Sequence, residues 1–526
     1  MKKNLLALLL AALMLLSVIP ASAESVLPWT GEKISYHVVG ADLIVENPES
    51  AVYKAFAEDI GNVELNWELA PLSDFATKLN LYLNSGEVPD LIWNYTYMST
   101  RATYGDEYWL NLTPYLEYMP NWKYYLDTMP AMAPLYDAEG GIYGIAQVTE
   151  YDWGSETWFY NKTALTALGY DAPPATWDEM HEMMLAYKAA NPDGMAFVTY
   201  AWGFGQWQSS WAQLGAWERG DFFYNEEKQS WDSSILNDES GYKALIEHMH
   251  LLYSEGLIPQ DFDAVSEQTI DQYVVTGNWL FGFFYNMAVE DEFFKGTEMP
   301  YELGHFITPA LTEGAQQYGR ITTRFNNTPT GAYQAGKDVQ NPEVMASLMD
   351  YTLSPEGNAL YTWGIEGVSY EVDDKGNKRF LEDYATNKEK REALGINGLH
   401  LLRLNQVTDM YANFMTTSGV GKSAVVELIN AFEDGTLKPC NFDTMNSPTL
   451  TMENADLKSQ NQTPTVTYLD EQKIKFITGE RPMDEWDEFK EEYKTYGDIE
   501  LIIELMNGGQ QNPIDQERRY MELSID

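Results

Sequence analysis

The stretch SDFATKLNLYLNSGEVPDLIW, residues 73–93, predicts a helix followed by a buried strand. Apolar residues recur with the four-residue spacing of one helix face, at Phe75, Leu79 and Leu83. Ser73 stands in the position of an N-cap, and Gly86 stands in the position of a helix stop. The apolar run VPDLIW that follows is typical of a buried strand.

Residues upstream continue the same alternation of strand and helix. ISYHVV at 34–39 predicts a first strand, residues 48–59 predict a helix, and VELNWELAP at 63–71 predicts a second strand. The order strand–helix–strand–helix–strand indicates an α/β layered unit. With 526 residues, the chain has the length of two or three folding units.

Later segments also carry signals for helices and turns. Thr176 and Glu179 form a capping box, in which each side chain accepts an amide hydrogen bond at a helix start. DFFYNEEKQSWDSS at 221–234 predicts a hairpin, and the order Asn341-Pro342 predicts a helix N-terminus. Near the C-terminus an amphipathic helix is expected, with apolar residues at Met483, Trp486, Phe489 and Tyr493.

Residues 1–23 have the order of a secretory signal peptide. Lys2 and Lys3 precede the apolar run 5–19, and Ala21-Ser22-Ala23 gives a small-residue cleavage site. We expect this segment to be removed and the mature protein to be secreted or extracytoplasmic, at the cell surface or in a periplasm. The single cysteine, Cys440, allows no internal disulfide, and because none follows the apolar run, no lipid-attachment cysteine is expected there.

The chain is strongly acidic, with 33 Lys and Arg against 80 Asp and Glu and a formal net charge of −47. Such a field repels phosphate backbones and anionic lipid, so nucleic acid and membrane surfaces are poor partners. Screening over about 8 Å still allows a local arginine to override the mean charge. Aromatic residues make up 14% of the chain, which is enough to build packed cores rather than a disordered chain.

Five blocks of the sequence, in order, resemble those of a known family. They are KLNLYLNSGEVPDLIW at 78–93, GGIYGIAQVTEYDWGSETWFYNKTALTALGYDAPPATWDEM at 140–180, LYSEGLI at 252–258, MDYTLSPEGNALYTWGIEGVSYEV at 349–372 and KFITGERPMDEWDEF at 475–489. The blocks resemble segments of extracellular solute-binding protein family 1, the sugar-binding type that serves ABC transporters. The last two resemble a large-chain, lipoprotein-like subgroup common in Gram-positive bacteria, and the resemblance covers nearly all of residues 34–506.

The resemblance implies an α/β, two-lobed periplasmic-binding-protein fold of type II, in which each lobe is a sheet flanked by helices. Lobe one is expected to hold residues 34–152 and 322–352, and lobe two residues 153–321 and 353–526. Crossings between the lobes are expected near 149–155 and 327–333. Ligand would lie in the cleft between the lobes, which would close about it by bending a hinge.

Tryptophan is concentrated in TYAWGFGQWQSSWAQLGAW, residues 199–217, which holds four of the 16 tryptophans in the chain. The C–H face of a sugar ring packs on a flat aromatic plane, and its rim hydroxyls pair with carboxylates and amides. Burying roughly 100 Å² in one stacked pair contributes about 2 kcal/mol, and each rim hydrogen bond adds roughly 1 kcal/mol. Trp211 and Trp217 fit a lobe core better, whereas Trp202 and Trp207 fit core and cleft about equally.

The expected ligand contacts are aromatic and polar residues at strand ends, at the first crossing and in loops that the resemblance places beside the cleft. They are Trp93, Asn94, Tyr95, Tyr97, Glu150, Tyr151, Asp152, Trp153, Trp202, Trp207, Tyr285, Asn286, Trp363 and Glu366. Arg101, Arg320 and Arg324 have two interpretations. If two of them face the cleft, they would bind the carboxylate of an acidic sugar bidentately. If they lie on the surface instead, they form salt bridges there.

Other chemistry is not favoured. SGVGKS at 418–423 lacks the first glycine of a phosphate-binding loop, because Thr416 stands in its place. His248 and His250 are two residues apart and so point to different faces of a helix, which makes a poor joint metal site. The segment NPDGMAFVTYAW lacks the later carboxylates of the calcium loop that many relatives in the family carry. We therefore expect no cofactor and no metal.

We expect the chain to be the extracellular substrate-binding component of an ABC importer. It would be a monomer, not an enzyme, that binds an oligosaccharide or other carbohydrate and delivers it to the permease subunits. Two alternatives stay open. One is a polysaccharide-binding surface protein without a transport role. The other is a glycoside hydrolase, which needs two carboxylates about 5–9 Å apart across a cleft.

Overall fold

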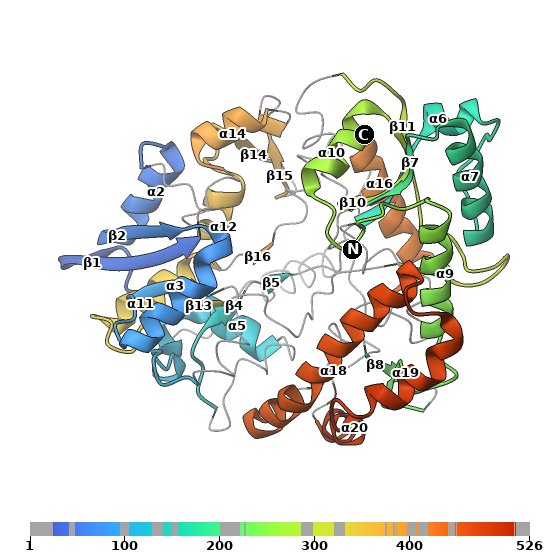
Figure 1. Ribbon diagram of the computed structural model, residues 1–526. Coiled ribbons are helices and arrows are strands. Elements are labelled where there is room, and N and C mark those ends of the chain that lie inside the picture. Colours follow the sequence, from blue (N-terminus) through green and yellow to red (C-terminus); the bar gives the residue numbers. More distant parts are fainter. Residues whose placement is uncertain are drawn as a thin grey trace, which may run out of the picture.

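The computed structural model describes residues 25–41, 48–94, 105–128, 140–146, 148–149, 156–199, 221–225, 228–285, 298–319, 332–373, 376–381, 384–385, 387–396, 407–408, 419–439, 448, 450–509 and 511. Its helices and strands form two lobes side by side, with the short strands β5 (Val148–Thr149) and β16 (Val407–Thr408) between them (Figure 1). Each lobe has its own sheet and its own cluster of buried apolar side chains.

The sheet of the first lobe has the strand order β2–β1–β3–β13–β4. Its strands are β1 (Trp29–Ala41), β2 (Gly61–Ala70), β3 (Leu91–Asn94), β4 (Ile145–Ala146) and β13 (Ala332–Ala335). β1 pairs in parallel with β2 on one side and with β3 on the other, as in a doubly wound sheet. The strand–helix alternation predicted for residues 34–93 is therefore confirmed.

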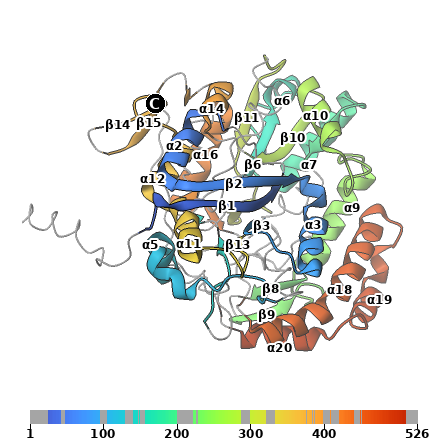
Figure 2. The same ribbon diagram turned by 90° about the vertical axis from the view of Figure 1, so that its left-hand side faces the viewer.

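Helices cover both faces of this sheet, and Figure 2 views the molecule from the side of this lobe. The helices of this lobe are α2 (Ala51–Ile60), α3 (Leu72–Ser85), η1 (Thr113–Tyr118), α5 (Pro120–Thr128), α11 (Pro342–Tyr351), α12 (Pro355–Thr362) and α14 (Lys388–Leu394). Because side chains alternate along a strand, Tyr36 and Val38 of β1 enter the core shared with α2 and α11. Val39 instead packs with α3 on the opposite face.

The predicted N-cap at Ser73 is wrong, although Gly86 does end α3. The helix already begins at Leu72, so that Pro71 occupies the N-cap position, where it makes no side-chain cap hydrogen bond. Gly86 follows the last turn with φ of 73°, a left-handed conformation that glycine adopts at little cost.

The sheet of the second lobe has the order β11–β6–β10–β7. Its strands are β6 (Glu156–Asn161), β7 (Met195–Val198), β10 (Trp279–Tyr285) and β11 (Leu303–Phe306). All residues of β6 are buried, as expected for a central strand. The helices of this lobe are α6 (Lys162–Ala167), α7 (Trp177–Ala190), α9 (Tyr242–Ser254), α10 (Glu267–Thr276), α16 (Gly419–Glu433), α18 (Met452–Thr478), η6 (Met483–Glu485), α19 (Trp486–Tyr493) and α20 (Ile499–Gly508).

The capping box predicted at the start of α7 is confirmed. Glu179 N donates to Thr176 Oγ1 at 3.2 Å, and Ala175 N donates to Glu179 Oε2 at 2.8 Å. The predicted hairpin is also present, as β8 (Phe222–Asn225) and β9 (Ser230–Ser233). Further two-stranded pairs are β12 (Gln317–Gly319) with β17 (Leu437–Pro439), and β14 (Tyr370–Val372) with β15 (Lys378–Phe380).

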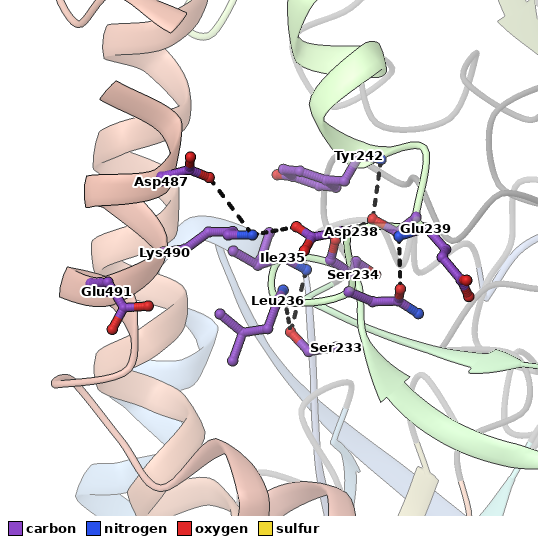
Figure 3. Close-up of polar contacts among 12 residues, drawn as sticks. Ser233, Ser234, Ile235, Leu236, Asp238, Glu239, Tyr242, Asp487, Lys490 and Glu491 are labelled. Carbon is purple, nitrogen blue, oxygen red and sulfur yellow. Dashed lines mark hydrogen bonds and ion pairs between the residues drawn. The ribbon is translucent and has the colours of Figure 1, made fainter. Parts of the chain in front are cut away.

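The C-terminal helices are attached to the second lobe by both apolar and polar contacts. α18 packs along α9 and α20, and the predicted stripe of α19 buries Trp486, Phe489 and Tyr493. Figure 3 shows Lys490 of α19 reaching the loop before α9, where it pairs with Asp238. These contacts place residues 452–508 in the second lobe.

Residues 353–396 were expected in lobe two, but their buried side chains pack in the first lobe. Leu353, Leu360, Tyr361, Trp363, Tyr370, Phe380, Tyr384 and Ile396 all belong to the core cluster of that lobe. Their apolar pattern correctly indicates burial, but a stripe of apolar residues carries no information about which core it joins. No helix within the described residues combines the length and apolar character needed to cross a bilayer.

Candidate functional site

One edge of the first sheet gathers the ends of several strands. Ala332, the first residue of β13, pairs with Asn94, the last of β3, and with Ala146, the last of β4. Because β1 and β2 run parallel to β3, their carboxyl ends point the same way. This is the carboxyl edge of the first sheet.

The second sheet has a matching edge. Tyr285, at the end of β10, pairs with Glu156 at the start of β6. β7 is parallel to β10, and its last residue, Val198, pairs with Gly282. The carboxyl ends of β7 and β10 therefore lie with the amino end of β6 at this edge.

A short piece of chain joins the two carboxyl edges and limits the distance between them. β5 ends at Thr149 and β6 begins at Glu156, seven residues later. At about 3.3–3.6 Å per residue, these ends lie at most about 25 Å apart. In open α/β sheets ligands bind at the carboxyl ends of strands. We call the two edges, defined by Asn94, Ala146 and Ala332 in one lobe and by Glu156, Val198 and Tyr285 in the other, the facing edges, and we take them as the candidate site.

Hydroxyl groups next to the second edge donate hydrogen bonds to backbone carbonyls of neighbouring strands. Thr157 Oγ1 donates to Phe306 O at 3.2 Å, and Thr199 Oγ1 donates to Phe283 O at 2.8 Å. Glu156 places a carboxylate at the same edge and is only 4% exposed. Sequence reasoning did not single out Glu156, because its place at this edge depends on its pairing with Tyr285, far along the chain.

The structure places the backbone of three predicted contact residues at the facing edges. Trp93 and Asn94 end β3, where they pair with Tyr333 and Ala332, and Tyr285 ends β10 opposite Glu156. The backbone thus brings these three positions to the two edges. Outside the described residues lie Tyr95, Tyr97, Glu150, Tyr151, Asp152, Trp153, Trp202, Trp207, Asn286 and the three arginines at 101, 320 and 324.

Trp363 does not offer a surface for stacking on a sugar. Its side chain is 1% exposed, and its ring lies 4.5 Å from Phe380 and 6.0 Å from Tyr370 in the core of the first lobe. Glu366, three residues later, is exposed. Burial, and secondarily the Glu366 carboxylate, raises the pKa of Tyr370. The expectation that Trp363 lines a cleft is therefore corrected, because its plane is already covered by other rings.

The segment that resembles a phosphate loop is part of a helix that covers the second sheet. α16 begins at Gly419, buries Gly421 and packs on β11. Its Glu427 Oε2 lies 2.7 Å from His305 Nδ1 of that strand. These contacts give the helix a structural role.

The two histidines of α9 diverge, as predicted. His250 Nδ1 lies 2.9 Å from Ile477 O, whereas the ring of His248 packs edge-on to Trp177 at 5.3 Å. Burial lowers the pKa of His248 to about 4. Across the described residues, no group of three or more His, Cys, Asp or Glu side chains could hold a metal ion.

Comparison with known proteins gives relatives over most of the chain. The fructooligosaccharide ABC transporter substrate-binding protein FusA of Streptococcus pneumoniae is 23% identical over 500 residues, covering 88% of this chain and 87% of FusA. Lipoprotein LipO of Bacillus subtilis is 25% identical over 297 residues, covering 53% of this chain and 55% of LipO.

Solved structures share the fold. The alginate-binding protein AlgQ2, solved without calcium ion, has a TM-score of 0.71 at 16% identity, over 91% of this chain and 98% of AlgQ2. FusA of S. pneumoniae in complex with kestose has a TM-score of 0.66 at 19% identity, over 89% of this chain and 98% of FusA. These likenesses confirm the two-lobed α/β fold.

A family model described as bacterial extracellular solute-binding protein matches residues 51–365. The match runs through both sheets, from α2 of the first lobe across the second lobe to the turn after α12. It spans more than half of the chain and includes both facing edges. This chain belongs to the bacterial extracellular solute-binding protein family.

Proposed function

We propose that this protein is the substrate-binding component of an ABC importer and binds an oligosaccharide between its two lobes. The observation that carries the proposal is the architecture, namely two separately packed lobes, each with its own sheet, joined by a short piece of chain between their carboxyl edges. The chain also aligns over 88% of its length with a protein named as a fructooligosaccharide-binding component of such a transporter.

The chemistry of a sugar suits a site made of two facing edges. The backbone positions at one edge are those of Trp93 and Asn94, and at the other those of Tyr285 and Glu156, which are residue types that can stack on a sugar ring or bond to its hydroxyls. Stacking of a ring face contributes about 2 kcal/mol per aromatic plane, and hydrogen bonds to rim hydroxyls add roughly 1 kcal/mol each. Three or four such contacts, less the free energy lost on association, give roughly micromolar affinity.

Several finer points belong to the same proposal. The protein acts outside the cytoplasm after removal of residues 1–23, works as a monomer with the permease subunits as partners, and releases its ligand chemically unchanged. The family is one of binding proteins. A hydrolase needs a pair of carboxylates across its cleft, whereas aromatic residues at the facing edges suit the binding of a sugar.

Isothermal titration calorimetry with a panel of neutral and acidic oligosaccharides, including kestose, tests the proposal. We expect one class of sugar to bind, and Trp93→Ala or Tyr285→Ala to weaken binding about tenfold or more. Tyr124→Ala is the matched control, because Tyr124 is 59% exposed on α5 and belongs to neither edge. Release of reducing ends would support a hydrolase instead, and equal binding by both edge variants and wild type would contradict the assigned site.

A further inference from the structure

The helices α18, α19 and α20 lie beyond the part of the chain that the family model matches, which ends at residue 365. In Figure 2, α18 and α20 lie beside the hairpin of β8 and β9. This hairpin has four residues in each strand and forms a sheet of its own. Because an isolated two-stranded hairpin is only marginally stable in water, its position depends on the elements that pack against it.

Helix α20 binds the second strand of the hairpin through its backbone. Trp231 N donates to Asn507 Oδ1 at 2.8 Å, and Asn507 Nδ2 donates to Trp231 O at 3.3 Å. The side chain of Trp231 is bound as well, because its Nε1 donates to Gln511 Oε1 at 3.0 Å. The amide of Asn507 therefore pairs with the backbone of Trp231 as a neighbouring strand would, with one donor and one acceptor.

Further contacts lie at the two ends of the hairpin. Asp221, directly before β8, is 1% exposed and accepts from Gln462 of α18 and from Tyr493 of α19. Lys490 of α19 pairs with Asp238, in the loop that follows β9 (Figure 3). The start of the hairpin, its second strand and the loop after it are thus all bound to the C-terminal helices.

The hairpin follows directly on the tryptophan-rich part of the sequence. The chain leaves the second edge at Thr199, which is fully buried and bonded through its hydroxyl to β10, and the structure describes it again from Asp221. Residues 200–220 join these two points and contain two of the predicted ligand contacts, Trp202 and Trp207. The contacts of Asp221 therefore fix the point at which this segment enters the hairpin.

We propose that the C-terminal helices brace the hairpin of β8 and β9 as a support for sugar binding, with Asp221 and Asn507 as positioning residues. Neither side chain needs to touch the ligand. Once the brace is lost, a ligand that packs against residues 200–220 must order the hairpin as well, and this lowers its affinity. The effect on affinity rests on the proposed function, whereas the brace itself can be measured without ligand.

Hydrogen exchange followed by mass spectrometry tests the brace in the ligand-free protein. Asn507→Ala removes both backbone contacts of α20, and because Asn507 is exposed, we expect this variant to fold. We expect the amides of residues 222–233 to exchange about fivefold faster or more, with unchanged exchange in β10. Lys475→Ala is the matched control, because Lys475 forms its ion pair within α18, with Glu471.

Calorimetry with kestose, or with the sugar of the panel that wild-type protein binds, tests the positioning role. Asp221→Ala removes the acceptor that faces Gln462 and Tyr493, and we expect it and Asn507→Ala to weaken binding about threefold to tenfold. Asp221→Asn can still accept from Gln462 and can donate to Tyr493, so we expect it to restore binding to within about twofold of wild type. A role in stability alone would leave the affinity of every folded variant unchanged.

The two measurements separate the possible failures. Exchange of the hairpin at the wild-type rate in both Asn507→Ala and Asp221→Ala would overturn the brace. Faster exchange with unchanged affinity would overturn the positioning role and leave the proposed function intact. If wild-type protein binds no sugar of the panel, the proposed function fails and the positioning role fails with it, whereas the exchange rates still decide whether the helices brace the hairpin.

Discussion

Asp350 in the first lobe and Asp221 in the second are both buried carboxylates, but their surroundings differ. Asp350 accepts from the start of α5, from Asn121 N at 3.3 Å, Asn121 Nδ2 at 2.7 Å and Trp122 N at 2.7 Å. Asp221 accepts from side chains of the C-terminal helices, from Gln462 Nε2 at 2.9 Å and Tyr493 Oη at 3.3 Å. Burial raises the pKa of each carboxyl to about 6.

The difference shows what each carboxylate holds in place. Backbone N–H groups can only donate, so Asp350 serves as a fixed anionic cap on α5 and ties it to α11. A tyrosine hydroxyl can donate or accept, so the contacts of Asp221 with α18 and α19 can adjust. In both cases the partners belong to the same lobe, which agrees with two bodies that are stabilised separately.

The largest contrast is expected between Asp350→Asn and Asp221→Asn. The first substitution turns an acceptor oxygen into an amide donor that faces N–H donors, and we expect a loss of about 3 kcal/mol in the free energy of unfolding. The second lets an amide accept from Gln462 and donate to Tyr493, so we expect a change within about 1 kcal/mol. Urea unfolding at pH 8 measures both. Equal losses of unfolding free energy in the two variants would contradict the difference that we assign to the two carboxylates.

The pH dependence of the lobes should differ between pH 4.5 and 6.5. For Asp350 and Asp221 the folded pKa of about 6 exceeds the ordinary value of 3.8, so the folded state retains a proton that the unfolded chain has lost. Each therefore lowers stability as pH rises, by about 2 kcal/mol over this range. His248 acts in the opposite sense, because its folded pKa of about 4 lies below 6.5 and its contribution is lost as pH falls.

We therefore expect the first lobe to lose about 2 kcal/mol between pH 4.5 and 6.5 and the second to change less, since Asp221 and His248 oppose each other there. Urea unfolding monitored by ¹⁹F NMR of fluorotryptophan separates the lobes, with Trp122 buried in the first core and Trp279 in the second. Asp350→Asn should flatten the first-lobe profile. If the stability of both lobes changed with pH in the same way, the assignment of these changes to Asp350, Asp221 and His248 would be contradicted.

A smaller effect on stability is expected from two helix caps, one in each lobe. Ser354 Oγ accepts from Gly357 N at 3.0 Å in the first lobe, and Thr176 Oγ1 accepts from Glu179 N at 3.2 Å in the second. Alanine at either position should cost about 1 kcal/mol. In the same ¹⁹F experiment, each loss should be confined to its own lobe, and a loss shared by both lobes would indicate one cooperative unit.

Much of the fold could be predicted because its signals are local. The spacing of Phe75, Leu79 and Leu83 predicts α3, and the pair Thr176 and Glu179 predicts the start of α7; both are confirmed. Membership of a lobe is not a local property. The buried rings of Trp363 and Phe380 have the same apolar signature whichever core they join, so residues 353–396 were assigned to the wrong lobe.

The sequence indicates at which strand ends the candidate site lies better than it indicates which side chains line it. Trp93, Asn94 and Tyr285 lie at the ends of buried strands, which meet at an edge of the sheet, and their contact with a ligand stays a prediction. Trp363 follows a helix, where aromatic residues serve a core as readily as a ligand. Glu156 opens a strand after a crossing, and its closeness to Tyr285 depends on a pairing across more than one hundred residues that no local pattern reveals.

Movement of the two lobes toward each other around an oligosaccharide is tested most directly by small-angle X-ray scattering, with and without the sugar that binds in calorimetry. We predict a smaller radius of gyration in the bound state, because a ligand held by both edges favours the closed arrangement. Saturating sugar that leaves the radius unchanged would contradict closure and favour a surface protein that holds polysaccharide without transport.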